Sequence, residues 1–308
     1  MKTKVKQRDI TFGTDVEAGL FHNGVAKNIP CTAFNTPYTK DKRKVWGLEG
    51  SYHRDNILTE FQTPVCSTWK DLCKAIMVCH KLLSEEYSRL NCNLVYQPVI
   101  TYKDQEMVEI DEAYEMGCDP DICAYSGQEV VGPDADTMGQ RRAASGHIHI
   151  GGIEDMSDEQ KRQLVLFLDA TIGQYTAARE AELGDSYKYR RHWYGQAGRY
   201  RLKPYGIEYR TPSNMWVGDL IAPRGPEPGD DASTYISKAI IASIDLIDQG
   251  KSVVDFIAPS DMDRVRAAID GTFHFKGGRV IDWWAALHFA RQCTSDALYD
   301  LGVALPDV

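Results

Sequence analysis

The sequence predicts an α+β fold, in which one β-sheet carries the functional residues on its polar face and helices cover the other face. The main observation is that four segments with strand character alternate polar or charged side chains with mostly apolar ones. Amphipathic helical patterns separate several of these segments. The chain has 308 residues, of which 43% are hydrophobic and 26% are charged, so it is long enough to bury a large core.

The first predicted strand lies within residues 8–20 and carries Asp15 and Glu17 on its polar face, with Val16 between them on the core side. Two carboxylates that are two residues apart on one strand face repel each other. A divalent cation would compensate for this repulsion. Solvated carboxylates at the edge of a sheet are the alternative interpretation.

The next part of the chain adds a strand, a helix, another strand and a long loop. A strand at residues 57–63 places Glu60 in a third acidic position on the polar face. The apolar spacing of residues 69–90 predicts an amphipathic helix, and residues 93–102 have the composition of a strand. Residues 103–137 are acidic and weakly patterned, which indicates either a functional lid or an ordinary surface loop.

A histidine pair marks the third polar strand. Residues 141–152 alternate His147 and His149 with isoleucines, so a strand here presents both imidazoles on one face. Such a pair indicates metal or phosphate binding, although a structural role is the default interpretation of a histidine. Residues 157–183 follow with the clearest helical pattern of the chain, and they begin at a capping box.

The fourth segment, residues 199–214, is densely charged. Glu208 and Arg210 share a strand face, where a carboxylate can bind a cation and a guanidinium fork can bind phosphate oxygens. A cross-strand ion pair on a solvated face is the alternative. Arginines and aromatic residues interleaved between positions 189 and 203 are also compatible with single-stranded nucleic acid. The net charge of -9 and the nearby carboxylate favour a nucleoside triphosphate instead.

The remaining features restrict the class of protein. Helical patterns at residues 232–250, 261–270 and 282–301 indicate core packing rather than a site. Eight cysteines form no CxxC pair, which favours buried free thiols over disulfides or a zinc ribbon. The first ten residues lack the apolar region of a secretory signal, and no apolar run approaches a membrane span. We therefore expect a cytoplasmic protein with no membrane partner, and the acidic balance disfavours nucleic acid as a partner.

Over roughly residues 10–216, the chain resembles the phage-type COOH-NH2 ligases (amidoligases), a branch of the glutamine synthetase and glutamate–cysteine ligase superfamily. Five motifs in the expected order carry the resemblance, and the last is long and specific. They are G-x-D-x-E (Gly13 to Glu17), D-N-x-x-x-E-F (Asp55 to Phe61), G-C-D-P-D (Gly117 to Asp121), G-H-I-H-I-G (Gly146 to Gly151) and Y-G-x-A-G-x-Y-R-x-K-P-Y-G-x-E-Y-R (Tyr194 to Arg210).

The resemblance implies a glutamine synthetase-like catalytic domain. Its curved antiparallel β-sheet would form a half-barrel with helices on the outer face, with ATP at one end of the funnel and the substrates at the other. One carboxylate–amine ligase domain would span residues 1–308. Residues 10–216 would carry the site, and residues 217–308 would mainly complete the helical layer.

The resemblance also implies two metal sites and a group of phosphate contacts. The metal nearer the γ-phosphate would be held by Asp15, His147 and Glu208. The metal nearer the substrates would be held by Glu17 and Glu60, with Asp55 or Glu49 completing the set. Phosphates would be contacted by His149, Arg199, Arg201, Lys203 and Arg210, of which Arg201 and Arg210 would act in catalysis.

The implied activity is ATP-dependent carbon–nitrogen ligation with Mg²⁺ or Mn²⁺ as cofactor. ATP would phosphorylate a carboxylate, and an amine would attack the acyl phosphate to give an amide or peptide-like bond. The substrates would be small-molecule or peptide carboxylates and amines, and a homo-oligomer stays open. A bacteriophage-encoded protein of this kind would act in the host cytoplasm. The alternatives are a guanidino-type phosphotransferase on the same fold, a metal-dependent amidohydrolase and a degenerate binding module.

Overall fold

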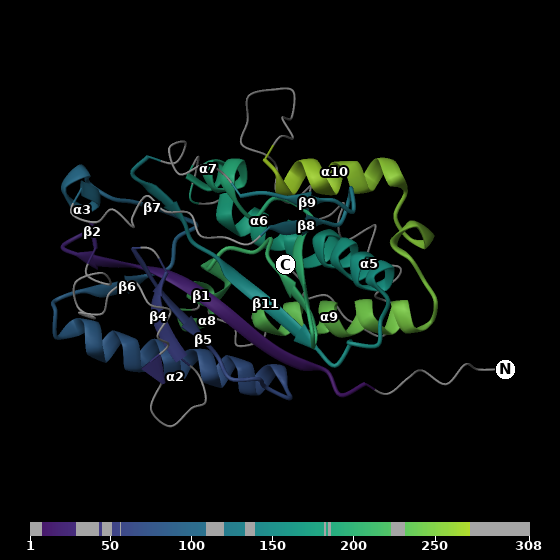
Figure 1. Cartoon of the computed structure of the whole chain (residues 1–308), viewed down its shortest axis with the longest axis horizontal. Helices are drawn as coiled ribbons and strands as arrows, with labels where there is room; N and C mark the ends of the chain where they lie inside the picture. The colour runs from purple at the N-terminus through teal and green to yellow at the C-terminus, as the bar shows by residue number, and fades with distance from the viewer. Residues whose placement is uncertain are drawn as a thin grey trace.

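The computed structural model describes residues 8–28, 43–44, 51–55, 57–108, 120–132, 139–181, 183, 186–222 and 232–271. Within these residues the protein is an α+β structure, with a large antiparallel sheet and helices packed against it (Figure 1). The predicted fold class is therefore confirmed. The half-barrel curvature of the sheet and the single-domain organisation of residues 1–308 stay predictions.

Eleven of the described strands form one sheet around the long strand β1, and every pairing in it is antiparallel. Its hydrogen-bonded order is β3-β4-β5-β1-β11-β13-β12-β8-β9, and β2 and β6 pair with β1 as well. Strands β7 and β10 form a separate pair. The strands are β1 (Thr11–His22), β2 (Val25–Lys27), β3 (Arg43–Lys44), β4 (Ser51–Asp55), β5 (Leu58–Gln62), β6 (Asn93–Val95), β7 (Val99–Thr101), β8 (Asp121–Cys123), β9 (Glu129–Val130), β10 (Arg141–Ala143), β11 (Gly146–Gly151), β12 (Arg199–Lys203) and β13 (Gly206–Tyr209).

Two of the described helices, α2 and α5, begin at capping residues that the sequence predicted. Thr68 accepts a hydrogen bond from the backbone of Asp71 at the start of α2, and Ser157 and Gln160 form the predicted capping box of α5. Among the described helices, none combines the length and the apolar composition that a bilayer crossing requires. The helices are α2 (Trp69–Ser88), α3 (Asp104–Val108), α5 (Asp158–Leu168), the π-helix η2 (Asp169–Gly173), α6 (Gln174–Ala181), α7 (Ser186–Trp193), α8 (Met215–Ile221), α9 (Ala232–Asp248), the 3-10 helix η3 (Val253–Asp255) and α10 (Pro259–Ile269).

One face of the sheet packs into a continuous apolar core. Val16 of β1, Ile148 and Ile150 of β11, and Ile207 and Tyr209 of β13 are fully buried in this core, which they share with residues of α2, α5, α6, α8, α9 and α10. In Figure 1 the purple strand β1 crosses the molecule beside the teal strand β11, with helices along both. Because successive side chains of a strand point to opposite faces, the residues between these apolar ones lie on the other face. The predicted alternation is confirmed in all three strands.

Two predicted strands are each broken in the structure. Residues 93–102 form β6 and β7, which pair with different partners on either side of a bend at Pro98, a residue without a backbone N–H to donate. Residues 141–152 form β10 and β11, separated at Ser145. The Ser145 N–H donates to the Glu17 carboxylate (2.7 Å) instead of to a strand ladder. The Ser145 N–H is therefore bonded to a side chain of β1 at the gap between β10 and β11.

The region 103–137 contains regular structure, contrary to the prediction of an unpatterned loop. Its described part includes α3, β8 and β9, and β8 pairs with β12 in the main sheet. Three-residue and two-residue strands are too short to show a periodic pattern, which is why the sequence did not reveal them. Residues 109–119 and 133–138 lie outside the described residues, so the two interpretations of the region, a lid or a surface loop, stay predictions.

The long helical segment 157–183 is interrupted by the π-helix η2 between α5 and α6. The Asp169 carboxylate at its start accepts a hydrogen bond from the Tyr209 hydroxyl (2.6 Å). Burial raises the pKa of Asp169 to about 7. This contact ties the helical layer to β13, the strand that carries Glu208.

Several other predictions concern smaller features. The helices predicted at 232–250 and 261–270 correspond to α9 and α10, whereas α8 was not predicted. The helix predicted at 282–301 lies outside the described residues. Five cysteines within the described ranges are free thiols, as the sequence predicted: Cys66, Cys73, Cys79, Cys92 and Cys123.

Candidate functional site

The polar face of the sheet brings the four charged segments together. Strand pairing places residues of β5, β1, β11, β13 and β12 directly opposite one another, and opposed residues share a face. The opposed pairs are Glu17–Glu60, Asp15–His147, His149–Glu208 and Arg201–Glu208. Residues scattered over almost two hundred positions of sequence therefore line one continuous surface.

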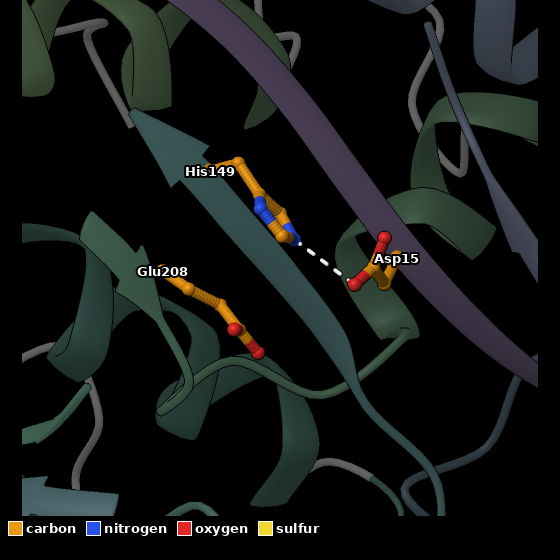
Figure 2. Close-up of side chains that lie close together, drawn as sticks. All are labelled: Asp15, His149 and Glu208. Carbon is orange, nitrogen blue, oxygen red and sulfur yellow. Dashed lines mark ion pairs between the residues drawn. The ribbon is translucent and has the colours of Figure 1, made fainter. Parts of the chain in front are cut away.

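Asp15, His149 and Glu208 form the first cluster on this surface. Their side chains come from the neighbouring strands β1, β11 and β13, and His149 and Asp15 point toward each other (Figure 2). The His149 Nε2 lies 3.1 Å from an oxygen of Asp15, and one ligand-type atom from each of the three residues lies within 4.8 Å of the others. The Tyr205 hydroxyl forms a hydrogen bond with His149 Nδ1. This bond leaves Nε2 directed toward the carboxylates, as a metal-ligating histidine requires.

Glu17, Asp55 and Glu60 form the second cluster, which is purely carboxylate. Burial and the neighbouring Asp55 raise the pKa of Glu17, whose carboxylate accepts a hydrogen bond from the backbone of Ser145. Burial raises the pKa of Glu60 well above its usual range, and the negative charges of Asp15, Asp55 and Glu17 add to this effect. A cluster of three carboxylates, two of them buried, fits a hard divalent cation, because the charge of the cation removes both the repulsion and the desolvation penalty. Glu49, the alternative to Asp55, lies outside the described residues.

Three basic side chains surround the buried carboxylate of Glu208. Lys203 Nζ lies 2.7 Å from one of its oxygens, and Arg201 Nη1 lies 3.9 Å from the other. Arg210 Nη1 forms an ion pair with that second oxygen. The Glu208 side chain is only 2% exposed, so these charges are screened little by water. Glu208, a predicted metal ligand, is therefore in direct contact with side chains that were predicted to bind phosphate.

His147 lies beside this group. Its Nδ1 is 3.3 Å from Glu208, and its Nε2 is 3.4 Å from the Tyr194 hydroxyl. Burial, followed by the positive charge of Arg210, lowers the pKa of His147 well below its usual value, so the imidazole is neutral. The structure thus groups His149, rather than His147, with Asp15 and Glu208. Metal or phosphate binding by either histidine stays a prediction.

The other predicted phosphate contact, Arg199, lies two residues before Arg201 on β12. Its backbone carbonyl accepts a hydrogen bond from the N–H of Arg210 (2.9 Å). This contact ties the start of β12 to the residue that follows β13. The structure does not group the Arg199 side chain with the ion pairs around Glu208.

Two arginines of the basic stretch have a structural position instead of a phosphate-binding one. Arg190 and Arg191 are buried in α7 and donate to the carbonyl of Thr211. Arg191 also forms a bidentate pair with the buried carboxylate of Glu180. Gly195, at a φ of +64°, passes so close to the Arg190 guanidinium that a Cβ there would clash. These contacts support the chain on either side of the site.

Residues 136–224 match the family model described as Phage phiEco32-like COOH.NH2 ligase-type 2. The match confirms the resemblance over these residues, which include β11, β12 and β13 with both histidines and the basic group. The description of this family points to carboxylate–amine ligase activity, that is, to carbon–nitrogen bond formation. A comparison with curated proteins found no match.

The ligase-type stretch does not include every residue that the structure brings to the site. Asp15, Glu17, Asp55 and Glu60 come from strands before it, and so does Asp121. Asp121 was not among the predicted site residues, although it ends the G-C-D-P-D motif, whose first three residues lie outside the described ranges. Tyr194 and Tyr205 were also missed as contacts of the histidines, and both lie inside the long motif that carried the resemblance.

Proposed function

We propose that the protein is an ATP-dependent carboxylate–amine ligase that forms an amide or peptide-like bond through an acyl phosphate. The observation that carries this proposal is the convergence of three basic side chains on Glu208, beside two clusters with metal-type ligands, on one sheet face. A hydrolase that acts on amides would need no such group of phosphate-binding cations. The resemblance to the COOH-NH2 ligases also supports a curved, half-barrel sheet, which would shape this face into a funnel.

Charge balance explains why a cation must enter with the nucleotide. Arg201, Lys203 and Arg210 are already ion-paired with Glu208 or Asp121, so ATP alone would bring more negative charge to a nearly neutral surface. Magnesium or manganese held by Asp15, His149 and Glu208 and by the second carboxylate cluster would neutralise phosphate oxygens and the incoming carboxylate. The donor set, which mixes carboxylates with one imidazole, fits these ions.

In the proposed reaction, an oxygen of the substrate carboxylate attacks the γ-phosphorus of ATP, and the bond to the β-phosphate oxygen breaks. Arg201 and Arg210 neutralise the oxygens of the phosphoryl group in transfer. The nitrogen of the amine then attacks the acyl carbon, phosphate leaves, and the amine loses a proton. The substrates would be a small-molecule or peptide carboxylate and a second molecule with a free amine.

The nucleotide product tests this proposal. The protein is incubated with Mg²⁺, ATP, pools of carboxylic acids and hydroxylamine, and the nucleotides and hydroxamates are separated by chromatography. We expect ADP, phosphate and a hydroxamate, because hydroxylamine traps an acyl phosphate without the natural amine. A Glu208→Gln variant should lose the activity, whereas Glu159→Gln, in an exposed ion pair with Arg162, should retain it. AMP as the main product would refute the mechanism. ADP without hydroxamate would favour a guanidino-type phosphotransferase.

A further inference from the structure

Asp121 is a buried carboxylate at the edge of the site. It begins β8, and the pairing of Tyr200 with Ile122 sets it beside Arg201 on the neighbouring strand β12. The residue is 8% exposed. It lies outside the stretch that matches the ligase family, so the match assigns it no role.

The contacts of Asp121 are unusual because one carboxylate oxygen serves two arginines. Its Oδ1 lies 2.8 Å from Nε of Arg210 and 3.2 Å from Nε of Arg201. On the opposite edge of both guanidinium groups, Nη1 faces Glu208. The two arginines therefore lie between two carboxylates. Both Nε atoms face Asp121, and both Nη1 atoms face Glu208.

This arrangement restricts how each guanidinium can rotate. An arginine side chain has several rotatable bonds, and holding it in one orientation without a partner is entropically costly. Ion pairs from Nε to Asp121 on one side and from Nη1 to Glu208 on the other hold each guanidinium between two carboxylates and limit its rotation. Because Asp121 acts on both arginines through a single atom, it also fixes their orientation relative to each other.

We propose that Asp121 is a positioning residue that holds Arg201 and Arg210 as one preorganised pair for the phosphoryl group in transfer. The inference rests on the proposed function, since it assigns these arginines to phosphoryl transfer. Asp121 itself does not contact the substrates. Without it, both guanidinium groups would turn toward Glu208, a second carboxylate with which both form ion pairs.

A planar phosphoryl mimic tests the inference without the natural substrates. Calorimetry compares ADP and Mg²⁺ with ADP, Mg²⁺ and aluminium fluoride, which imitates the group in transfer. We expect Asp121→Asn to bind ADP like wild type but to lose most of the affinity gained with aluminium fluoride, on the order of 10- to 100-fold. Asp121→Glu, which keeps the charge, should recover part of that gain. Asp155→Asn, which removes a carboxylate from Arg8 outside the site, should behave like wild type.

Three results would overturn the inference. If Asp121→Asn retains the full gain with aluminium fluoride, the carboxylate does not position the arginines. If it loses ADP affinity and thermal stability together, and Asp121→Glu does the same, the role of Asp121 is only structural. If wild type itself gains no affinity with aluminium fluoride and yields no ADP in the product assay, the proposed function fails, and this inference fails with it.

Discussion

Replacing Glu180 with glutamine should destabilise the protein strongly. Glu180 and Arg191 are both 0% exposed and form a bidentate pair, with Arg191 Nη2 at 2.8 and 2.7 Å from the two carboxylate oxygens. The N–H of Ser213 also donates to Glu180. The Glu180→Gln change removes the only negative member of this pair and leaves the charge of Arg191 buried.

The size of the effect follows from that burial. Removing one partner of a buried ion pair costs about 3–5 kcal/mol, because the remaining charge is desolvated without compensation. Native proteins are stable by only about 5–15 kcal/mol, so the variant should lose a large part of its stability. A double variant, Glu180→Leu with Arg191→Met, should lose less stability than the single variant, because no charge is left unpaired, while the Ser213 N–H loses its acceptor at a cost of about 1–3 kcal/mol. The Thr211 carbonyl, to which Arg191 donates, keeps its second hydrogen bond from Arg190 (2.9 Å).

Urea denaturation followed by circular dichroism measures these differences. Glu159→Gln is the matched control, because its ion pair with Arg162 is exposed and should contribute less than about 1 kcal/mol. If Glu180→Gln lost less than about 1 kcal/mol, or if the double variant were less stable than the single one, the buried pair would not be the source of stability at this position.

Two further predictions concern the site. Arg210→Lys loses the fork geometry of arginine, so the rate of ADP release should fall roughly 100-fold. Circular dichroism should show an unchanged fold. Turnover close to that of wild type would contradict the role of Arg210. Replacing Mg²⁺ by EDTA should weaken ATP binding at least about tenfold in calorimetry, because no cation would then bridge the phosphates to the carboxylates of the two clusters; equal affinity in both buffers would contradict the metal assignment.

The parts of the fold that follow from local periodicity could be predicted from the sequence. The alternation around Val16 and Ile207 assigned each carboxylate to the correct face, because a strand has a strict period of two. Helix α2 was predictable from its apolar spacing and its capping residue, Thr68. Both signals lie within a few consecutive residues and need no knowledge of the partners in space.

The sequence could not show which residues join each cluster, because that depends on the register with which neighbouring strands pair. His147 and His149 have the same face and nearly the same sequence context, yet pairing with β13 sets His149 opposite Glu208. A shift of two residues would exchange them and would leave the pattern of faces unchanged. The resemblance implied His147 for the first metal, the structure groups His149 with Asp15 and Glu208, and the choice between the two histidines as a metal ligand stays a prediction.

Burial of charge was the other unpredictable feature. In the sequence, Arg190 and Arg191 belong to a basic, aromatic stretch that looks exposed. Their burial depends on contacts with Glu180 and with the carbonyl groups that follow Arg210, and the sequence does not show these contacts. Asp121 likewise needed the pairing of a three-residue strand before it could be assigned to the site. In each case, the informative contact joins residues that are distant in the sequence or that lie in an element too short to have a pattern.

The central position of β1 organises both halves of the proposed site. Asp15 joins the cluster on the β11 and β13 side, where the basic side chains lie, and Glu17 joins the carboxylates of β5 and β4. Strand geometry sets these two residues roughly 6.6 Å apart along β1, which is close enough for one phosphate group to lie between the clusters. The charge of Asp15 is among the causes that raise the pKa of Glu60, so the two clusters already interact. On the proposed function, one strand therefore fixes the spacing between the phosphate-binding and substrate-binding halves.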